Sequence, residues 1–126
     1  MDHNFQKSLT SSNIPYNIGD ILISLFYKKN YKALNQSYSV ELEPDYSLEV
    51  SNISSGKSLK IFFDAKFKFD DGSVKSEDIH KMHTYKDAIN GYSSIVLFPG
   101  HNNIFYKDHS SNSPFSGVGA FVMKLF

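Results

Sequence analysis

The most regular alternation of apolar and polar positions in this chain runs from Leu59 to Phe69. The odd positions are apolar: Ile61, Phe63, Ala65, Phe67 and Phe69. The even positions are mostly polar: Lys60, Asp64, Lys66, Lys68 and Asp70. Because successive side chains of a strand point to opposite faces, this pattern predicts a strand whose odd face lies in the core and whose even face carries the polar groups.

A different period follows this strand and predicts a helix from Ser76 to about Ile89. Ser76 can cap the helix, and Glu77 and Asp78 suit the positive end of its dipole. Asn90-Gly91 provides a left-handed stop. Apolar residues recur at three- and four-residue spacing on one face: Ile79, Met82, Tyr85, Ala88 and Ile89.

A short apolar run, Ser94 to Phe98, closes at Pro99-Gly100 and predicts a buried strand. Strand, helix and strand in this order form a βαβ unit with a right-handed crossover and parallel strands. We therefore expect an α/β fold with a mixed sheet and at least one crossover helix.

The other segments carry weaker patterns. Ile21 to Tyr31 favours a strand, with a short helix as the alternative, and Pro44 marks an edge or a break between two strand-like pieces. The remaining expectations are a loosely ordered segment over residues 1–17, strands at Tyr38–Leu42 and Tyr46–Val50, a long loop at His101–Ser116, a tight bend at Gly117–Gly119 and a final strand at Val118–Phe126.

Length, charge and residue usage limit the possible functions. A chain of 126 residues suits one domain, and the lack of cysteine excludes disulfides, thiolate zinc sites and cysteine nucleophiles. The formal net charge of zero argues against a strong grip on nucleic acid by this segment alone. No secretory signal and no apolar run long enough to span a membrane is visible, so we expect a cytoplasmic protein without a membrane partner.

Asp45, Asp64 and Lys66 are the candidates for chemistry. Asp64 and Lys66 share one face of the predicted strand, and if the strand of Asp45 is its neighbour, the two carboxylates approach to about 4 to 6 Å. Such a pair repels by about 4 kcal/mol at 4 Å with a surface-like dielectric, so it favours a cation between its members. Two carboxylates and a backbone carbonyl such as that of Ala65 suit Mg²⁺ or Mn²⁺.

A metal site of this kind suits phosphodiester hydrolysis, with Lys66 orienting the attacking water or stabilising the developing negative charge. The alternative is that Asp64 and Lys66 are solvated residues on an exposed sheet face. In either case the side chain of Asp64 is expected to leave the core, so that Asp64→Ala should cost little stability.

Five segments together resemble the nuclease domain associated with McrC-like restriction proteins, a PD-(D/E)XK family: EPDYSLEV, IFFDAKFKFD, EDIHKMHTYKDAI, SIVLFPG and GVGAF. The resemblance covers about Ser39 to Phe121. It implies a restriction-endonuclease-like core, Asp45 and Asp64 as metal ligands and Lys66 as the catalytic lysine. It also implies a Mg²⁺-dependent DNA endonuclease in a prokaryotic restriction or defence system with possible partner subunits.

The helix contributes further candidates. Lys81, His83 and Tyr85 are similar in placement to the Q-x-x-x-Y element of related nucleases, although Tyr85 falls equally on the apolar stripe. His80 and His83 are three apart, yet no third ligand stands at a matching spacing, which favours helix-surface histidines.

One feature departs from the superfamily pattern, since its members usually carry a further glutamate on a helix before the first acid. No glutamate precedes Glu41 in this chain. This absence predicts a truncated domain from the C-terminal part of a longer protein. It also leaves open a second function, a catalytically silent module that retains the nuclease fold and binds nucleic acid or protein partners.

Overall fold

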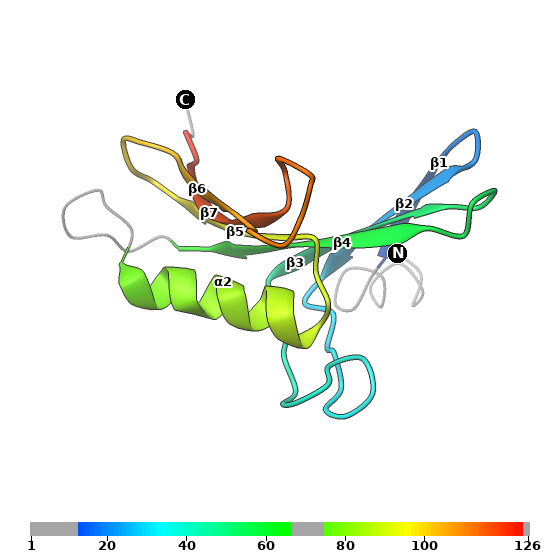
Figure 1. The fold of residues 1–126 in the computed structure, drawn as a ribbon, viewed down its shortest axis with the longest axis horizontal. Coiled ribbons are helices and arrows are strands. Elements are labelled where there is room, and N and C mark those ends of the chain that lie inside the picture. The colour runs from blue at the N-terminus through cyan, green and yellow to red at the C-terminus, as the bar shows by residue number, and fades with distance from the viewer. Residues whose placement is uncertain (1–12, 67–74, 125–126) are drawn as a thin grey trace, which may run out of the picture.

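In the described part of the chain, seven strands form one mixed sheet, with a helix against one of its faces (Figure 1). The computed structural model describes residues 13–66 and 75–124. The strand order is β1-β2-β3-β4-β5-β7-β6. The elements are β1 (Asn13–Ile18), β2 (Ile21–Tyr27), β3 (Tyr46–Asn52), β4 (Ser58–Ala65), α2 (Ser76–Ala88), β5 (Ser93–Phe98), β6 (Ile104–Lys107) and β7 (Gly117–Val122).

The first four strands pair antiparallel, whereas β4, β5 and β7 run parallel to one another. The predicted strand, helix and parallel strand are therefore confirmed as β4, α2 and β5. β6 closes the far edge antiparallel to β7. This mixed sheet with its helix is the expected α/β architecture, consistent with a restriction-endonuclease-like core. The described part of the chain contains no helix long and apolar enough to cross a bilayer.

The helix begins and ends close to the predicted positions. Lys75 is its N-cap, one residue before the expected Ser76, and the Asp78 carboxylate accepts a hydrogen bond from the Lys75 amide at 3.2 Å. At the other end Asn90 adopts a left-handed φ of 58°. Gly91 follows, and a Cβ at this position would overlap the Phe62 ring. The glycine therefore allows the backbone to pass directly over the core.

The core lies between α2 and the even face of β4, which corrects the predicted orientation of this strand. Phe62 is fully buried, and its ring lies edge-on to Tyr31 and Tyr85, with centroids 5.6 and 6.3 Å away. The odd residues Ile61 and Phe63 are only half-buried. The even face is the one that α2 covers, so it becomes the interior although it carries the charged residues.

Several weaker expectations were also wrong. β1 occupies residues expected to be loosely ordered, and β6 lies within the expected long loop. Tyr38–Leu42 forms no strand, only an isolated bridge between Leu42 and Tyr31. β2 ends at Tyr27. Residues 1–12 and the positions of Phe67 and Phe69 lie outside the described residues.

Gly117 and Gly119 lie within β7 rather than in a bend before it. A Cβ at Gly119 would stand 2.5 Å from the Ile104 carbonyl oxygen and 2.9 Å from the Phe105 ring. These glycines therefore allow β6 and its aromatic side chain to lie directly against β7. The predicted final strand ends at Val122 within the described residues.

Candidate active site

Asp45 and Asp64 meet where β3 begins and β4 ends. Oδ1 of Asp64 accepts a hydrogen bond from the Asp45 amide at 2.9 Å, and Oδ2 of Asp45 accepts one from the Ala65 amide at 2.9 Å. Pro44 lies before this junction and is buried, and the ladder between the two strands starts at Tyr46. Each carboxylate is thus fixed to the backbone beside the other acid.

Asp64 is also held by the helix. Its side chain is nearly buried, with 6% of the residue exposed. Oδ2 accepts a hydrogen bond from the Tyr85 hydroxyl at 3.0 Å and lies 2.9 Å from Nζ of Lys81. Lys81 and Tyr85 are four residues apart and so lie on one face of α2. The acid on β4 and the two helix residues therefore form one cluster between helix and sheet.

The charges of this cluster alter the ionisation of its helix residues. The hydrogen bond to Asp64 raises the pKa of Lys81, and the negative charges of Asp64, Asp45 and Asp78 raise it further against the opposing effect of burial. Burial raises the pKa of Tyr85 far above its ordinary value, and the Asp64 charge adds to the rise. Lys81 is accordingly a cation and Tyr85 a hydrogen-bond donor throughout the neutral pH range.

Lys66 lies beside Asp64 but makes its ion pair with the helix. Its Nζ is 2.7 Å from the Asp78 carboxylate, and its amide donates to the Leu97 carbonyl at 2.8 Å. The hydrogen bond from the Lys66 amide to Leu97 continues the β4–β5 pairing beyond Ala65. It holds the Lys66 backbone next to Asp64.

A pocket of about 250 Å³ opens beside Asp64, and its lining combines three expected site residues with part of the helix but does not include Asp45. The lining residues are Asp64, Ala65, Lys66, Asp78, Lys81, Met82 and Val96. Asp78 was expected only as a helix-terminal acid. Its position three residues before Lys81 on the helix was the available sign that both side chains face the same place.

His83 lies elsewhere. It lines a separate pocket of about 580 Å³ on the side of α2 toward β6 and β7, together with His80 and His109. Tyr85 combines the two roles considered from the sequence, since its ring packs on Phe62 and its hydroxyl reaches Asp64. Of the three helix candidates, Lys81 and Tyr85 contact Asp64.

The residues present fit a hard divalent cation. Backbone amides hold the carboxylates of Asp45 and Asp64 at the same strand junction, and the Lys81 ammonium already lies 2.9 Å from Oδ2 of Asp64 as a positive charge. Within residues 13–66 and 75–124, no group of three or more His, Asp or Glu side chains stands close enough to hold an ion. Oxygen ligands in this small number suit Mg²⁺ or Mn²⁺, which retain water in much of their coordination shell.

Comparison with known proteins connects this geometry to a family. A sequence model of the PD-(D/E)XK nuclease superfamily matches residues 4–103, which includes both acids, Lys66 and the whole of α2. No curated protein and no solved structure matches the chain. The match covers most of the sequence, and the chain belongs to the PD-(D/E)XK nuclease superfamily.

Proposed function

We propose that this chain is the catalytic core of a Mg²⁺- or Mn²⁺-dependent DNA endonuclease. Superfamily membership implies a nuclease that acts on nucleic acid and generally uses a divalent metal. One observation carries the proposal: Asp45, just before β3, and Asp64, in β4, are tied together by backbone amides, and Asp64 lines an open pocket. In this proposal Asp45, Asp64 and the Ala65 carbonyl are the metal ligands, and Lys66 is the catalytic lysine.

The side chains around the pocket have distinct tasks in this proposal. A bound divalent ion would neutralise negative charge on the phosphoryl group and lower the pKa of a bound water molecule. Tyr85 and the Asp45 amide orient the Asp64 carboxylate, while Asp78 holds the Lys66 ammonium at the pocket wall. Lys66 is thereby placed to stabilise negative charge on a phosphoryl oxygen. Lys81 offers a second ammonium to the phosphate backbone of the substrate.

Replacement of Asp45 tests the function directly. Asp45→Asn keeps an oxygen for the Ala65 amide but removes a charge, so metal-stimulated cleavage of plasmid DNA should fall by about a hundredfold or more. Cleavage is measured with Mg²⁺, with Mn²⁺ and after chelation. Asp20→Asn is the matched control, because Asp20 lies in the β1–β2 turn and bonds to Ser54. Equal loss in the control, or unchanged cleavage by Asp45→Asn, contradicts the assignment. A parallel RNA substrate identifies which nucleic acid is cut.

Lys81 is expected to compete with the metal for Asp64. Its ammonium lies 2.9 Å from Oδ2, and at about 5 Å a divalent ion and an ammonium repel by between 1 and 2 kcal/mol even in a water-like dielectric. Lys81→Met should therefore bind Mn²⁺ about tenfold more tightly in a calorimetric titration. Lys57→Met, at an exposed position in the β3–β4 hairpin, should leave the affinity unchanged. Unchanged or weaker Mn²⁺ binding by Lys81→Met argues against the competition.

A second function also has a specific observation in its favour. Because the described residues include no group of three acids or histidines placed to hold an ion, and Lys81 already pairs with Asp64, the chain can also be a silent module that binds nucleic acid or protein without cleaving. Calorimetry separates the two functions, since only a competent site releases Asp64-dependent heat with Mn²⁺.

The wider context belongs to the same proposal. The likeness of the five segments to McrC-like nuclease domains favours a role in a cytoplasmic prokaryotic restriction or defence system. A chain with zero net charge needs partner subunits or further domains for much of its affinity for DNA.

A further inference from the structure

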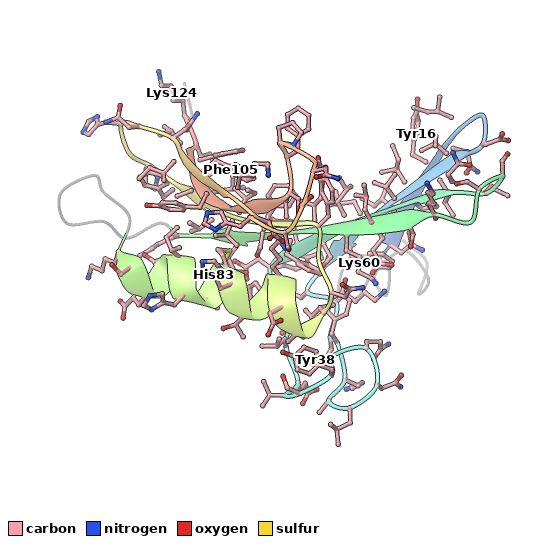
Figure 2. All side chains as sticks on the ribbon, viewed as in Figure 1. Tyr16, Tyr38, Lys60, His83, Phe105 and Lys124 are labelled. Carbon is pink, nitrogen blue, oxygen red and sulfur yellow. The ribbon has the colours of Figure 1, made fainter. Side chains whose placement is uncertain are left out.

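The sheet face turned away from α2 is apolar across the first four strands. The register places the even positions of β1 and β3 on the same face as the odd positions of β2 and β4, as in the row Tyr16, Ile23, Val50 and Leu59. We call this surface the open face. Figure 2 shows Tyr16 on one side of the sheet and Lys60 on the other side, where α2 lies.

The open face carries no charge on these strands. Each of its positions in β1, β2, β3 and β4 is apolar or tyrosine except Asn52, whereas the opposite face holds Glu49, Lys60 and Asp64. A surface without lysine or arginine is unsuited to a phosphate backbone, because most contacts of proteins with nucleic acid go to phosphate and are electrostatic. The open face is therefore not an extension of the candidate active site toward its substrate.

The open face is also large and accessible. Ile14, Tyr16 and Ile18 are 64%, 62% and 57% exposed. Together with Leu25, Tyr27 and Tyr46, which are also exposed, they present about 600 Å² if each side chain has a full area of about 200 Å². This exceeds most patches of monomeric proteins, and with the half-buried residues around it approaches the roughly 800 Å² per partner of a standard interface.

The part of the open face on β1 and β2 lies away from the hydrophobic core. β1 and β2 extend away from α2 (Figure 1), and the elements that α2 contacts are β4, β5 and β7. Every residue of β1 is exposed on both faces. β1 is the edge strand of the sheet and pairs only with β2, so burial of its apolar side would add stability that the described part of the chain does not itself supply.

We propose that two copies of this chain pack through their open faces, sheet against sheet. An uncharged surface can meet its own copy about a two-fold axis without repulsion between like charges. Two twisted sheets can pack about 10 Å apart with strands inclined by about 30°. Because Asp64 and α2 lie on the opposite face, the dimer leaves both pockets open to solvent on its outer sides.

Light scattering during size-exclusion chromatography of the full chain tests this dimer. The wild type should elute with about twice the 14.3 kDa mass of one chain. Ile14→Lys/Tyr16→Lys places charges on the open face and should give a monomer at micromolar concentration. Asn13→Lys/Asn17→Lys is the matched control, since it adds the same charges to the opposite side of the same strand and should remain a dimer.

A second measurement does not depend on the folding of the lysine variants. The chain has no cysteine, so Tyr16→Cys and Asn17→Cys each introduce one reactive group. A short bifunctional thiol reagent should link chains of Tyr16→Cys several-fold more than chains of Asn17→Cys. A monomeric wild type at about 100 µM, or equal linking of the two variants, overturns the proposal and leaves the open face to a different partner.

Discussion

Asp64→Ala should abolish metal-stimulated cleavage and at the same time weaken the fold. In the proposed site Asp64 is a metal ligand, and the loss of such a ligand would remove several kcal/mol of transition-state stabilisation, which corresponds to a rate decrease of at least about a thousandfold. The side chain is nearly buried and accepts hydrogen bonds from Tyr85 and from the Asp45 amide. Because alanine leaves these donors without a partner, the free energy of unfolding should fall by about 1 to 3 kcal/mol.

Asp64→Asn separates the two effects of that change. The amide keeps an oxygen acceptor in the same place but lacks the negative charge, so cleavage should still be lost while much of the stability returns. Cleavage of plasmid DNA and urea unfolding are measured on the same preparations. If Asp64→Ala cuts DNA at the wild-type rate, Asp64 is no metal ligand, and if its stability is unchanged, the side chain does not occupy the buried position beside Tyr85.

Phe62→Ala should produce the largest loss of stability. Phe62 is fully buried between the rings of Tyr31 and Tyr85, and truncation of such a core phenylalanine costs about 3 to 5 kcal/mol. Urea denaturation followed by circular dichroism gives the change in the free energy of unfolding. A loss of this size is a large part of the roughly 5 to 15 kcal/mol by which a typical domain is stable.

Phe63→Ala is the matched control for this prediction. Phe63 adjoins Phe62 in sequence but lies half-buried on the open face, so its truncation should cost less than half as much at the same protein concentration. If Phe63→Ala proves the more damaging substitution, the odd face of β4, and not the even face, is the principal core.

The comparison of Phe62 and Phe63 also explains how far the sequence could predict the fold. β4, α2 and β5 were predicted because their periods and the helix stop depend on local residues. The covered face of β4 was not, because both faces hold large apolar residues. The interior face is the one against which α2 packs, and this depends on contacts between segments that are distant in the sequence.

The candidate site shows the same division. The nearness of Asp45 and Asp64 followed from two strands with an acid at the end of each, and the structure pairs those strands. The contact of Lys81 with Asp64 and the ion pair of Lys66 with Asp78 depend on how the crossover returns the helix to the sheet. The spacing of residues within the strand or within the helix does not determine how far apart the side chains of the two elements lie.

β1 and β6 were missed for a different reason. β1 does alternate apolar and polar positions, but Pro15 and two asparagines are residue types that strands disfavour, and β6 is only four residues long. Both strands form because of their neighbours. Six residues of β2 pair with β1, and the two glycines of β7 leave room for β6 to pack closely.

The paired amide bonds of Asp45 and Asp64 tie the chemistry to the alignment of two strands. If β3 slid by one residue along β4, both bonds would break and the Asp45 carboxylate would turn to the other surface of the sheet. The hairpin between Asn52 and Ser58, far from the pocket, fixes that alignment through its length. Adding or deleting a single residue in this hairpin would therefore disable the pocket without altering any of its side chains.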